Sequence, residues 1–339
     1  MSKCSVAGVT IQGAVCAVPK TQIGNDSFVG RFDEKTITDV SALTGVTTRH
    51  IARPDQTTGD LCLAAAEQLL DTLQWPRDSV DALIFVSQTP DQRMPATACI
   101  LHGKLGLAHH CQAFDVGLGC SGYVYGLWLV SALMNAGLRR IILLAGDTSS
   151  RMIDPQDRST AMLFGDAGSA TAFEYAPDAP TAYFDLGTDG TGAQYLTVPG
   201  GGFRPTDPQD TKPDTLRMDG SAVFGFTIGT VPAIIRGILA QADRQIDDVD
   251  FFALHQANRF ILQHITKKLK IPAGRLPINI DQFGNTSSAS IPLLFCTTLA
   301  EELTTSPRTV LMSGFGVGLS WGCALFSNVQ LRCASVIHV

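Results

Sequence analysis

The chain has 339 residues, of which 45% are hydrophobic and 17% are charged, and its formal net charge is −6. This length and composition allow a large buried core, which excludes intrinsic disorder and favours two domains or one duplicated α/β unit. The negative charge excludes a general attraction to nucleic acid or to an anionic membrane surface, so an acidic partner requires a local basic patch.

The amino-terminal segment and the cysteines indicate a cytoplasmic protein. The first 20 residues lack the long leucine-rich core of a signal peptide and are typical of a strand, with valines and an isoleucine alternating around glycines. The nine cysteines form no CxxC pair, which is typical of reduced thiols. The seven histidines form no HExxH motif, and no GxGxxG motif follows the first strand. We therefore expect neither a metal nor another cofactor.

In chain order, short β-rich segments alternate with helical segments, as in a largely buried sheet covered by helices. The first half has predicted strands at residues 81–88, 111–116, 139–149 and 165–176 and a predicted helix at residues 96–107. A second helix begins near Ser121, in a segment without any charged residue from 116 to 138. This segment is long enough for a membrane span, but its glycines and the strand directly before it favour a buried helix between layers or at a subunit interface.

The second half of the chain repeats this order of elements. Residues 178–219 are rich in proline, glycine, aspartate and threonine, which predicts a loop-rich connection that partly covers a pocket. Helices are then predicted at residues 222–242, 257–270 and 287–303, a strand at 247–256, and two strands within 309–329. We place a boundary near residue 180, with one domain at residues 1–180 and the other at 181–339.

Cys120 is the first candidate for chemistry. It follows a strand and a glycine bend and opens the apolar helix. Free backbone N–H groups and the positive end of a helix dipole favour the thiolate there, so we expect a lowered thiol pKa. Gly119 and Gly122 on either side allow a sharp turn and the close approach of a substrate. A buried core cysteine is an equally good interpretation of this local context.

Three further features have both a catalytic and a structural interpretation. His255 lies at the carboxyl end of the predicted apolar strand 247–256, where ligands bind in α/β sheets, but it also suits a capping or core position. Asn285 lies in a turn before a serine-rich helix start, where asparagine usually serves the turn itself. The segment GFGVGLSWG (314–322) is an ordinary hairpin or a turn whose N–H groups stabilise an oxyanion.

Taken together, these pieces resemble β-ketoacyl-acyl-carrier-protein synthase III, a family of the thiolase superfamily. The resemblance covers most of the chain and rests on seven segments in order. They are TGVTTRHIA (44–52), AFDVGLGCSG (113–122), DPQDRSTAMLFGDAGSA (154–170), HQAN (255–258), KKL (267–269), GNTSSASIP (284–292) and GFGVGLSWG (314–322). The resemblance implies an α/β fold of duplicated, thiolase-like, five-layer α-β-α-β-α type, and a homodimer.

The resemblance also implies a reaction. The Cys120 thiolate takes an acyl group from an acyl thioester, on coenzyme A or on acyl carrier protein. Malonyl-acyl-carrier protein then enters, and His255 and Asn285 stabilise the enolate that forms as CO₂ leaves. Decarboxylative Claisen condensation gives a 3-oxoacyl thioester. The backbone N–H groups of Cys120 and Val317 form the oxyanion hole; the family often has glycine at the position of Val317.

Several positions match weaker parts of the family pattern. Arg259, Lys267 and Lys268 resemble the basic patch that binds the acidic carrier protein, although a solvated helix face explains them equally well. Met94 matches the residue that reaches the partner's acyl pocket, where bulky aromatics are common.

Other positions depart from the family pattern. Asp39 and Leu43 stand where the family often has a tryptophan and an arginine that hold the adenine of coenzyme A. This departure favours a carrier-protein donor or a differently held coenzyme A. Arg204, in the extended GGGFRP loop (200–205), suits either an acidic acyl group or a surface salt bridge.

Other functions remain as alternatives. The same cysteine, histidine and asparagine can serve a specialised acyltransferase or a pathway-specific condensing enzyme, which the departures at Asp39 and Leu43 favour. A non-catalytic partner subunit typically loses the nucleophile, which is present here. A papain-like protease requires a different cysteine context. A thiolase proper requires a second catalytic cysteine in the last glycine loop, and Cys323 lies after that loop.

Overall fold

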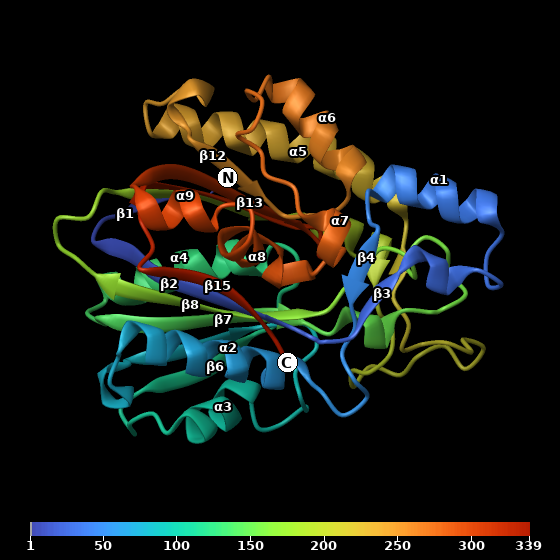
Figure 1. Cartoon of the computed structure of the whole chain (residues 1–339), viewed down its shortest axis with the longest axis horizontal. Coiled ribbons are helices and arrows are strands. Elements are labelled where there is room, and N and C mark those ends of the chain that lie inside the picture. The colour runs from blue at the N-terminus through green and yellow to red at the C-terminus, as the bar shows by residue number, and fades with distance from the viewer. Residues whose placement is uncertain (1) are drawn as a thin grey trace.

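Two mixed β-sheets form the frame of the molecule in a computed structural model that describes residues 2–339 (Figure 1). The six-stranded sheet has the order β15–β2–β8–β7–β5–β6, and the five-stranded sheet has the order β1–β9–β14–β13–β12. The strands of the first sheet are β2 (Val9–Val18), β5 (Ala82–Val86), β6 (Gln112–Val116), β7 (Arg140–Asp147), β8 (Ala167–Tyr175) and β15 (Cys333–His338). Those of the second are β1 (Ser2–Val6), β9 (Ala182–Thr188), β12 (Phe251–Leu254), β13 (Arg308–Gly316) and β14 (Ser320–Val329).

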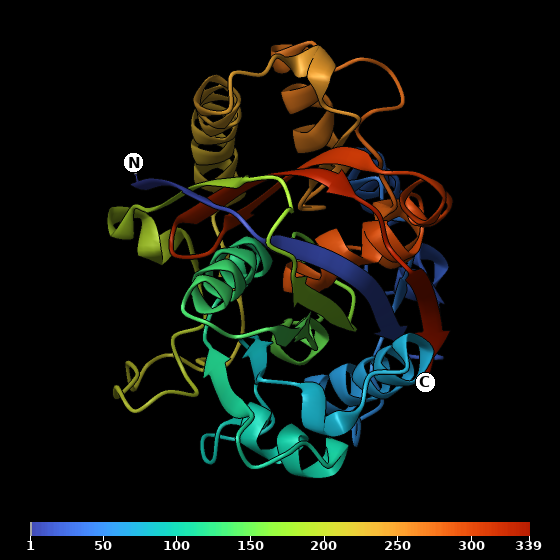
Figure 2. The same ribbon diagram turned by 90° about the vertical axis from the view of Figure 1, so that its left-hand side faces the viewer.

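Helices cover both sheets and fill the space between them, which gives five layers. Helices α2 (Thr58–Leu73) and α3 (Thr97–Leu105) pack on the outer face of the six-stranded sheet. Helices α4 (Gly122–Asn135) and α8 (Ser290–Cys296) lie between the sheets, in one apolar cluster with residues of both. Helices α5 (Gly220–Gln241) and α6 (Arg259–Leu269) cover the five-stranded sheet. Figure 2 shows the layers in succession, from the blue and cyan helices at the bottom to the olive and orange helices at the top. The expected α-β-α-β-α order is confirmed.

Four strands pair in the same order and directions in each of the two sheets, as expected for a duplicated fold. In the first sheet β2 pairs antiparallel with β8, β8 antiparallel with β7, and β7 parallel with β5. In the second sheet β9 pairs antiparallel with β14, β14 antiparallel with β13, and β13 parallel with β12. The corresponding strands also follow the same chain order in the two halves.

The ends of the chain tie the two halves together. The chain passes from the first sheet to the second between β8 and β9, in the segment that contains residue 180. However, β1 pairs with β9 in the second sheet, and β15 pairs with β2 in the first. Each sheet therefore contains a strand from the other half, and the division at residue 180 stays a prediction.

Several shorter elements complete the fold. Helix α1 (Glu34–Thr44) begins at Asp33, whose carboxylate accepts a hydrogen bond from the N–H of Thr36. The remaining short elements are β3 (Gln22–Gly24), β4 (Thr48–His50), β10 (Leu196–Thr197), β11 (Arg217–Met218), α7 (Ile280–Phe283) and α9 (Ala300–Thr305).

Two predicted elements were wrong. The connection at residues 178–219 contains β9, an inner strand of the second sheet, which the surrounding proline and glycine concealed. The predicted helix at 287–303 is interrupted, because Thr297 leaves helical geometry between α8 and α9. Its hydroxyl donates to the carbonyl of Leu293 and accepts from the Asn279 amide, an alternative to continued helix that threonine favours.

The two longest apolar helices differ in position. The segment that begins near Ser121 forms α4 in the middle layer, so the predicted buried helix is confirmed. Helix α5 is long and apolar enough to cross a membrane by length and composition alone. One side of α5 packs on the five-stranded sheet.

Candidate active site

The thiol of Cys120 lies in the middle layer, between the end of β6 and the start of α4. Two glycines of β13 allow that strand to pass directly beside it. A Cβ on Gly314 would lie 2.7 Å from the carbonyl oxygen of Cys120, and one on Gly316 would lie 2.8 Å from its Cβ and 3.1 Å from its Sγ. The glycine turn and the nucleophile predicted from the sequence are therefore neighbours, and side chains at these glycines are excluded.

The expected lowering of the Cys120 pKa was wrong. Burial raises the pKa of the thiol to about 11, and the charge of Asp147 raises it further. The Ser287 hydroxyl and the backbone N–H groups of Cys120 and Val317 lower the pKa, but by less than burial raises it. The predicted oxyanion pair thus faces the sulfur, while the thiol itself stays protonated in the resting protein.

His255 follows β12 and is buried, with only 1% of its surface exposed. Its Nδ1 shares a hydrogen bond of 2.7 Å with the hydroxyl of Ser290, and the ring meets Phe315 edge-on. Burial lowers the pKa of His255 to about 3, so the imidazole is neutral near pH 7. A neutral ring fixed at Nδ1 offers its other nitrogen to a reacting group.

Asn285 is held where two segments of the chain cross. Its backbone N–H donates to the carbonyl of Leu163, and its carbonyl accepts from Gly165. Gly165 permits this crossing, because a Cβ there would lie 2.1 Å from the carbonyl oxygen of Phe283. The side-chain amide donates to the carbonyl of Ala257, at 3.4 Å.

Ser287 contacts all three predicted residues and was missed by the sequence analysis. Its hydroxyl lies 3.8 Å from the Cys120 sulfur, and its N–H donates to Oδ1 of Asn285 at 2.9 Å. A backbone hydrogen bond with Ser287 raises the pKa of His255 against the effect of burial. Ser287 has φ of 51°, a left-handed conformation uncommon outside glycine, and such conformations cluster at functional sites.

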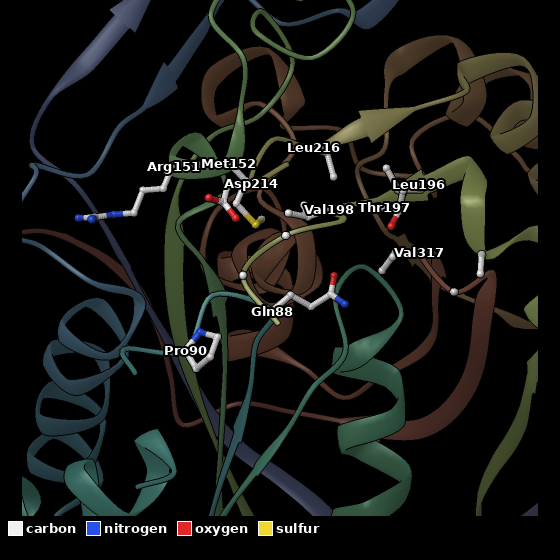
Figure 3. Close-up of a pocket in the computed structure, with 14 residues that line it drawn as sticks. Gln88, Pro90, Arg151, Met152, Leu196, Thr197, Val198, Asp214, Leu216 and Val317 are labelled. Carbon is white, nitrogen blue, oxygen red and sulfur yellow. The ribbon is translucent and has the colours of Figure 1, made fainter. Parts of the chain in front are cut away.

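Two connected cavities lead away from the thiol. A small cavity of about 30 Å³ is lined by Cys120, Asp147 and Ser287, among others. A chamber of about 680 Å³ adjoins it (Figure 3). The two share the lining residues Gln88, Met152, Leu196, Leu216 and Val317. Val198, Gly200, Gly201 and Asp214 also line the chamber, so the loop-rich connection covers a pocket as predicted. Arg151 points away from the chamber in Figure 3 and donates to three backbone carbonyls.

The predicted carrier-binding residues do not form one group. Arg259 begins α6 and packs against Gly45, whereas Lys267 and Lys268 lie in the last turn, about 12 Å further along the helix. Lys268 donates to the carbonyl of Ile228 on α5. Only Arg259 adjoins the groove between α1 and α6.

That groove has a volume of about 680 Å³ and contains the two departures from the family pattern, Asp39 and Leu43. Phe260, which is 46% exposed, lines its other side. Met94 is 82% exposed on the loop before α3. Arg204 is also exposed, and it is not among the residues that line the chamber.

Replacing Gly316 with alanine should slow acyl transfer to Cys120 about 10- to 100-fold. The added methyl group would lie within 3 Å of the Cys120 Cβ, so either the strand or the thiol must move. Rapid-quench mass spectrometry measures the rate of acylation. Gly117→Ala is the matched control, because a Cβ at this glycine, in the loop that carries Cys120, meets nothing within 4 Å. Equal rates for both variants would contradict the close approach.

His255 should make stability depend on pH. Burial lowers the pKa of His255 to about 3 from 6.5, so the unfolded chain binds the proton first as the pH falls. The contribution of neutral His255 to the free energy of unfolding is therefore complete above about pH 6.5. It is lost as the pH falls toward about 3, by up to about 1.4 kcal/mol per pH unit. Urea unfolding of the wild type and His255→Gln at about pH 7.5 and 5 measures the difference between their free energies of unfolding at each pH. A free-energy difference that does not shrink at the lower pH would contradict the buried, neutral state.

A buried thiol under a glycine turn, beside a neutral histidine and an asparagine, defines a thiolase-fold enzyme of the acyl-transferring condensing class. Residues 114–190 match the family model described as 3-oxoacyl-[acyl-carrier-protein (ACP)] synthase III, and residues 239–327 match the model of its C-terminal part. The chain belongs to the 3-oxoacyl-[acyl-carrier-protein] synthase III family.

Individual relatives support this assignment over the whole chain. A putative 3-oxoacyl-[acyl-carrier-protein] synthase 3 of Campylobacter jejuni is 34% identical over 96% of both chains. The crystal structure of a 3-oxoacyl-(acyl-carrier protein) synthase from Burkholderia xenovorans LB400 is 46% identical, with a TM-score of 0.97 over 100% of this chain and 99% of that one. A 3-oxoacyl-(acyl carrier protein) synthase III from Pseudomonas aeruginosa PAO1 is 33% identical, with a TM-score of 0.86 over 95% and 99%.

Proposed function

We propose that this enzyme transfers an acyl group from a thioester to Cys120 and condenses it with malonyl-acyl-carrier protein to give a 3-oxoacyl-acyl-carrier protein. The observation that supports the proposal is the contact of Ser287 with Cys120, His255 and Asn285, because it brings together the three residues to which we assign the roles of nucleophile and enolate stabilisers. The backbone N–H groups of Cys120 and Val317 hold the oxyanion of the tetrahedral intermediate. The reaction needs no metal or other cofactor.

The chamber beside Cys120 is where we place the acyl chain. It adjoins the small cavity that Cys120 lines, and Gln88 and Val317 line both (Figure 3). We propose a cytoplasmic homodimer without a membrane span, in which the exposed Met94 contacts the partner. An exposed methionine adapts its shape to an apolar neighbour at low cost.

We propose that the acyl donor is bound to a carrier protein. In the groove between α1 and α6, Asp39 and Leu43 replace the family's tryptophan and arginine, and a carboxylate and an aliphatic side chain can neither stack on the adenine of coenzyme A nor donate a hydrogen bond to it. Arg259, at the start of α6 beside this groove, offers a positive charge to the acidic carrier protein, while Lys267 and Lys268 extend the basic surface along α6.

Intact-protein mass spectrometry with matched acyl-coenzyme A and acyl-carrier-protein thioesters tests this proposal. We expect acylation of the wild type to be faster from the carrier protein. The double variant Asp39→Trp/Leu43→Arg, which places the family's residues at these positions, should raise the rate from acyl-coenzyme A about tenfold. An unchanged preference in the variant would contradict the role of these positions, and a wild type without any adduct would contradict the proposed function.

A second candidate function is transfer of the acyl group to an oxygen or nitrogen acceptor by the same site. The extended loop at residues 198–216 favours it, because this loop shapes a chamber of about 680 Å³ that can receive an acceptor as well as an acyl chain. Discharge of the acyl-enzyme without release of CO₂ would support this function over condensation.

A further inference from the structure

A buried carboxylate lies close to the nucleophile. Asp147 ends β7 and is 1% exposed. Its Oδ1 accepts hydrogen bonds from the N–H of Gln88 at 2.8 Å and the hydroxyl of Ser87 at 3.1 Å, and its Oδ2 accepts one from the hydroxyl of Ser288 at 3.0 Å. Its hydrogen-bond partners in the described part of the chain are neutral donors, and burial raises the pKa of this carboxyl. A carboxylate in such surroundings is a stronger base than an exposed one.

Asp147, Ser287 and Cys120 share one cavity. All three line the cavity of about 30 Å³, and the Cys120 sulfur lies 3.8 Å from the Ser287 hydroxyl. The Ser287 hydroxyl lowers the pKa of the Asp147 carboxyl, and the next residue, Ser288, donates a hydrogen bond of 3.0 Å to that carboxylate, so the side chain of Ser287 lies close to Asp147. The serine hydroxyl therefore lies beside the protonated thiol of Cys120, in the cavity that the Asp147 carboxyl also lines. The cavity of about 30 Å³ is also large enough for one water molecule, which requires about 10–15 Å³.

The other titratable groups near this cavity are unsuited to accept the thiol proton. His255 lies on the other side of Ser287, and burial lowers its pKa to about 3. Cys62 on α2 faces Asp147, but burial raises the pKa of Cys62 so that it stays a neutral thiol. Cys120 itself has a pKa of about 11 and must lose its proton before or during attack on a thioester.

We propose that Ser287 is a further catalytic residue, which passes the proton of Cys120 to the carboxylate of Asp147 as the sulfur attacks. The inference rests on the proposed function for the identity of the acyl donor. The S–H bond of Cys120 breaks as the sulfur bonds to the thioester carbon. The Ser287 hydroxyl oxygen takes that proton and at the same time gives its own proton to Oδ2 of Asp147. When the bond from the carbonyl carbon to the carrier sulfur breaks, the leaving thiolate takes a proton from the Ser287 hydroxyl. Ser287 takes the proton of Asp147 in turn, which restores the carboxylate.

Alkylation of Cys120 by iodoacetamide tests the proton path without an acyl donor, so its outcome does not depend on the proposed function. Intact mass gives the rate from about pH 5 to pH 10. In the wild type we expect a rise as Asp147 ionises and then a plateau, since the internal base is saturated. In Asp147→Asn the plateau should be replaced by a rate proportional to hydroxide, about 10- to 100-fold slower near pH 7. Acylation by the accepted thioester should follow the same profiles.

Two serine variants separate proton transfer from structure. Ser287→Gly removes the hydroxyl but tolerates φ of 51°, where alanine would be strained, and it should behave as Asp147→Asn. Ser288→Ala removes a hydrogen bond to the same carboxylate from a side chain that does not contact the thiol. This control should keep the plateau and move its acid limb to higher pH, because the Ser288 hydroxyl lowers the pKa of Asp147.

If Asp147 acts only as a negative charge, Asp147→Asn should change the rate of alkylation in the opposite direction. The carboxylate raises the pKa of Cys120, so its removal would then speed alkylation near pH 7. A faster Asp147→Asn variant overturns the proposal, and so does a Ser287→Gly variant that keeps the wild-type plateau. A uniform fall in rate with an unchanged profile would assign Asp147 a structural role only and also overturns it. A wild type that is alkylated on this profile but never acylated would leave the proton path standing and contradict the proposed function.

Discussion

Cys120→Ala should abolish the acyl adduct and reduce condensation by a factor on the order of 10⁴ or more, because no other group can take over covalent transfer. The thiol lies under the glycine turn of β13, where the N–H groups of Cys120 and Val317 face its sulfur. The smaller side chain leaves a small void without a strained backbone, so the variant should fold. The measurement is intact mass after incubation with acyl thioester, followed by peptide mapping.

Cys99→Ala is the matched control for this result. Cys99 is an exposed free thiol on α3 and the most accessible competitor for adventitious acylation. We expect this variant to keep both the adduct and the activity. An adduct that persists in Cys120→Ala and disappears in Cys99→Ala would place the nucleophile elsewhere and contradict the site.

His255→Ala and Asn285→Asp should separate the two half-reactions. Both residues are proposed to stabilise the malonyl enolate, so acylation of Cys120 should continue while condensation falls about 10²- to 10³-fold. Asn285→Asp is the sharper variant, because the carboxylate still accepts the N–H of Ser287 at the position of Oδ1 but loses the amide donor. Single-turnover assays of adduct formation and of adduct discharge by malonyl-acyl-carrier protein measure the two steps.

Thermal unfolding of these variants provides the control for structure. Asn285 lies at the crossing of two segments, so Asn285→Ala should lower stability by more than Asn285→Asp. If His255→Ala and Asn285→Asp slow acylation as much as condensation while remaining folded, their assignment to the enolate step is wrong.

The sequence was informative where local pattern determines structure. The glycine bend before an apolar helix located Cys120 at a helix start, and the alternation of elements predicted a largely buried sheet covered by helices. The second sheet and the five layers followed only from the family resemblance. β9 escaped prediction, because its seven residues stand between segments rich in glycine and proline and gain most of their stability from neighbours distant in the chain.

Burial explains most of what the sequence could not predict about the site. The helix start at Cys120 does lower the thiol pKa through backbone N–H groups, but the surrounding layers exclude water and raise it to about 11. Ser287 and Asp147 lie 140 residues apart in the sequence, so no local motif links them. The hydroxyl-rich GNTSSAS segment (284–290) was the available signal for Ser287, and the residues after β7 offered none for Asp147.

The most direct test of the account is the fate of an acyl group on Cys120 when malonyl-acyl-carrier protein is added. The enzyme is first acylated and freed of donor, and then intact mass and released CO₂ are followed in one turnover. We predict that the adduct disappears as one CO₂ is released for each 3-oxoacyl-acyl-carrier protein formed. An adduct that persists, or that discharges without CO₂, would contradict decarboxylative condensation as the function of this site.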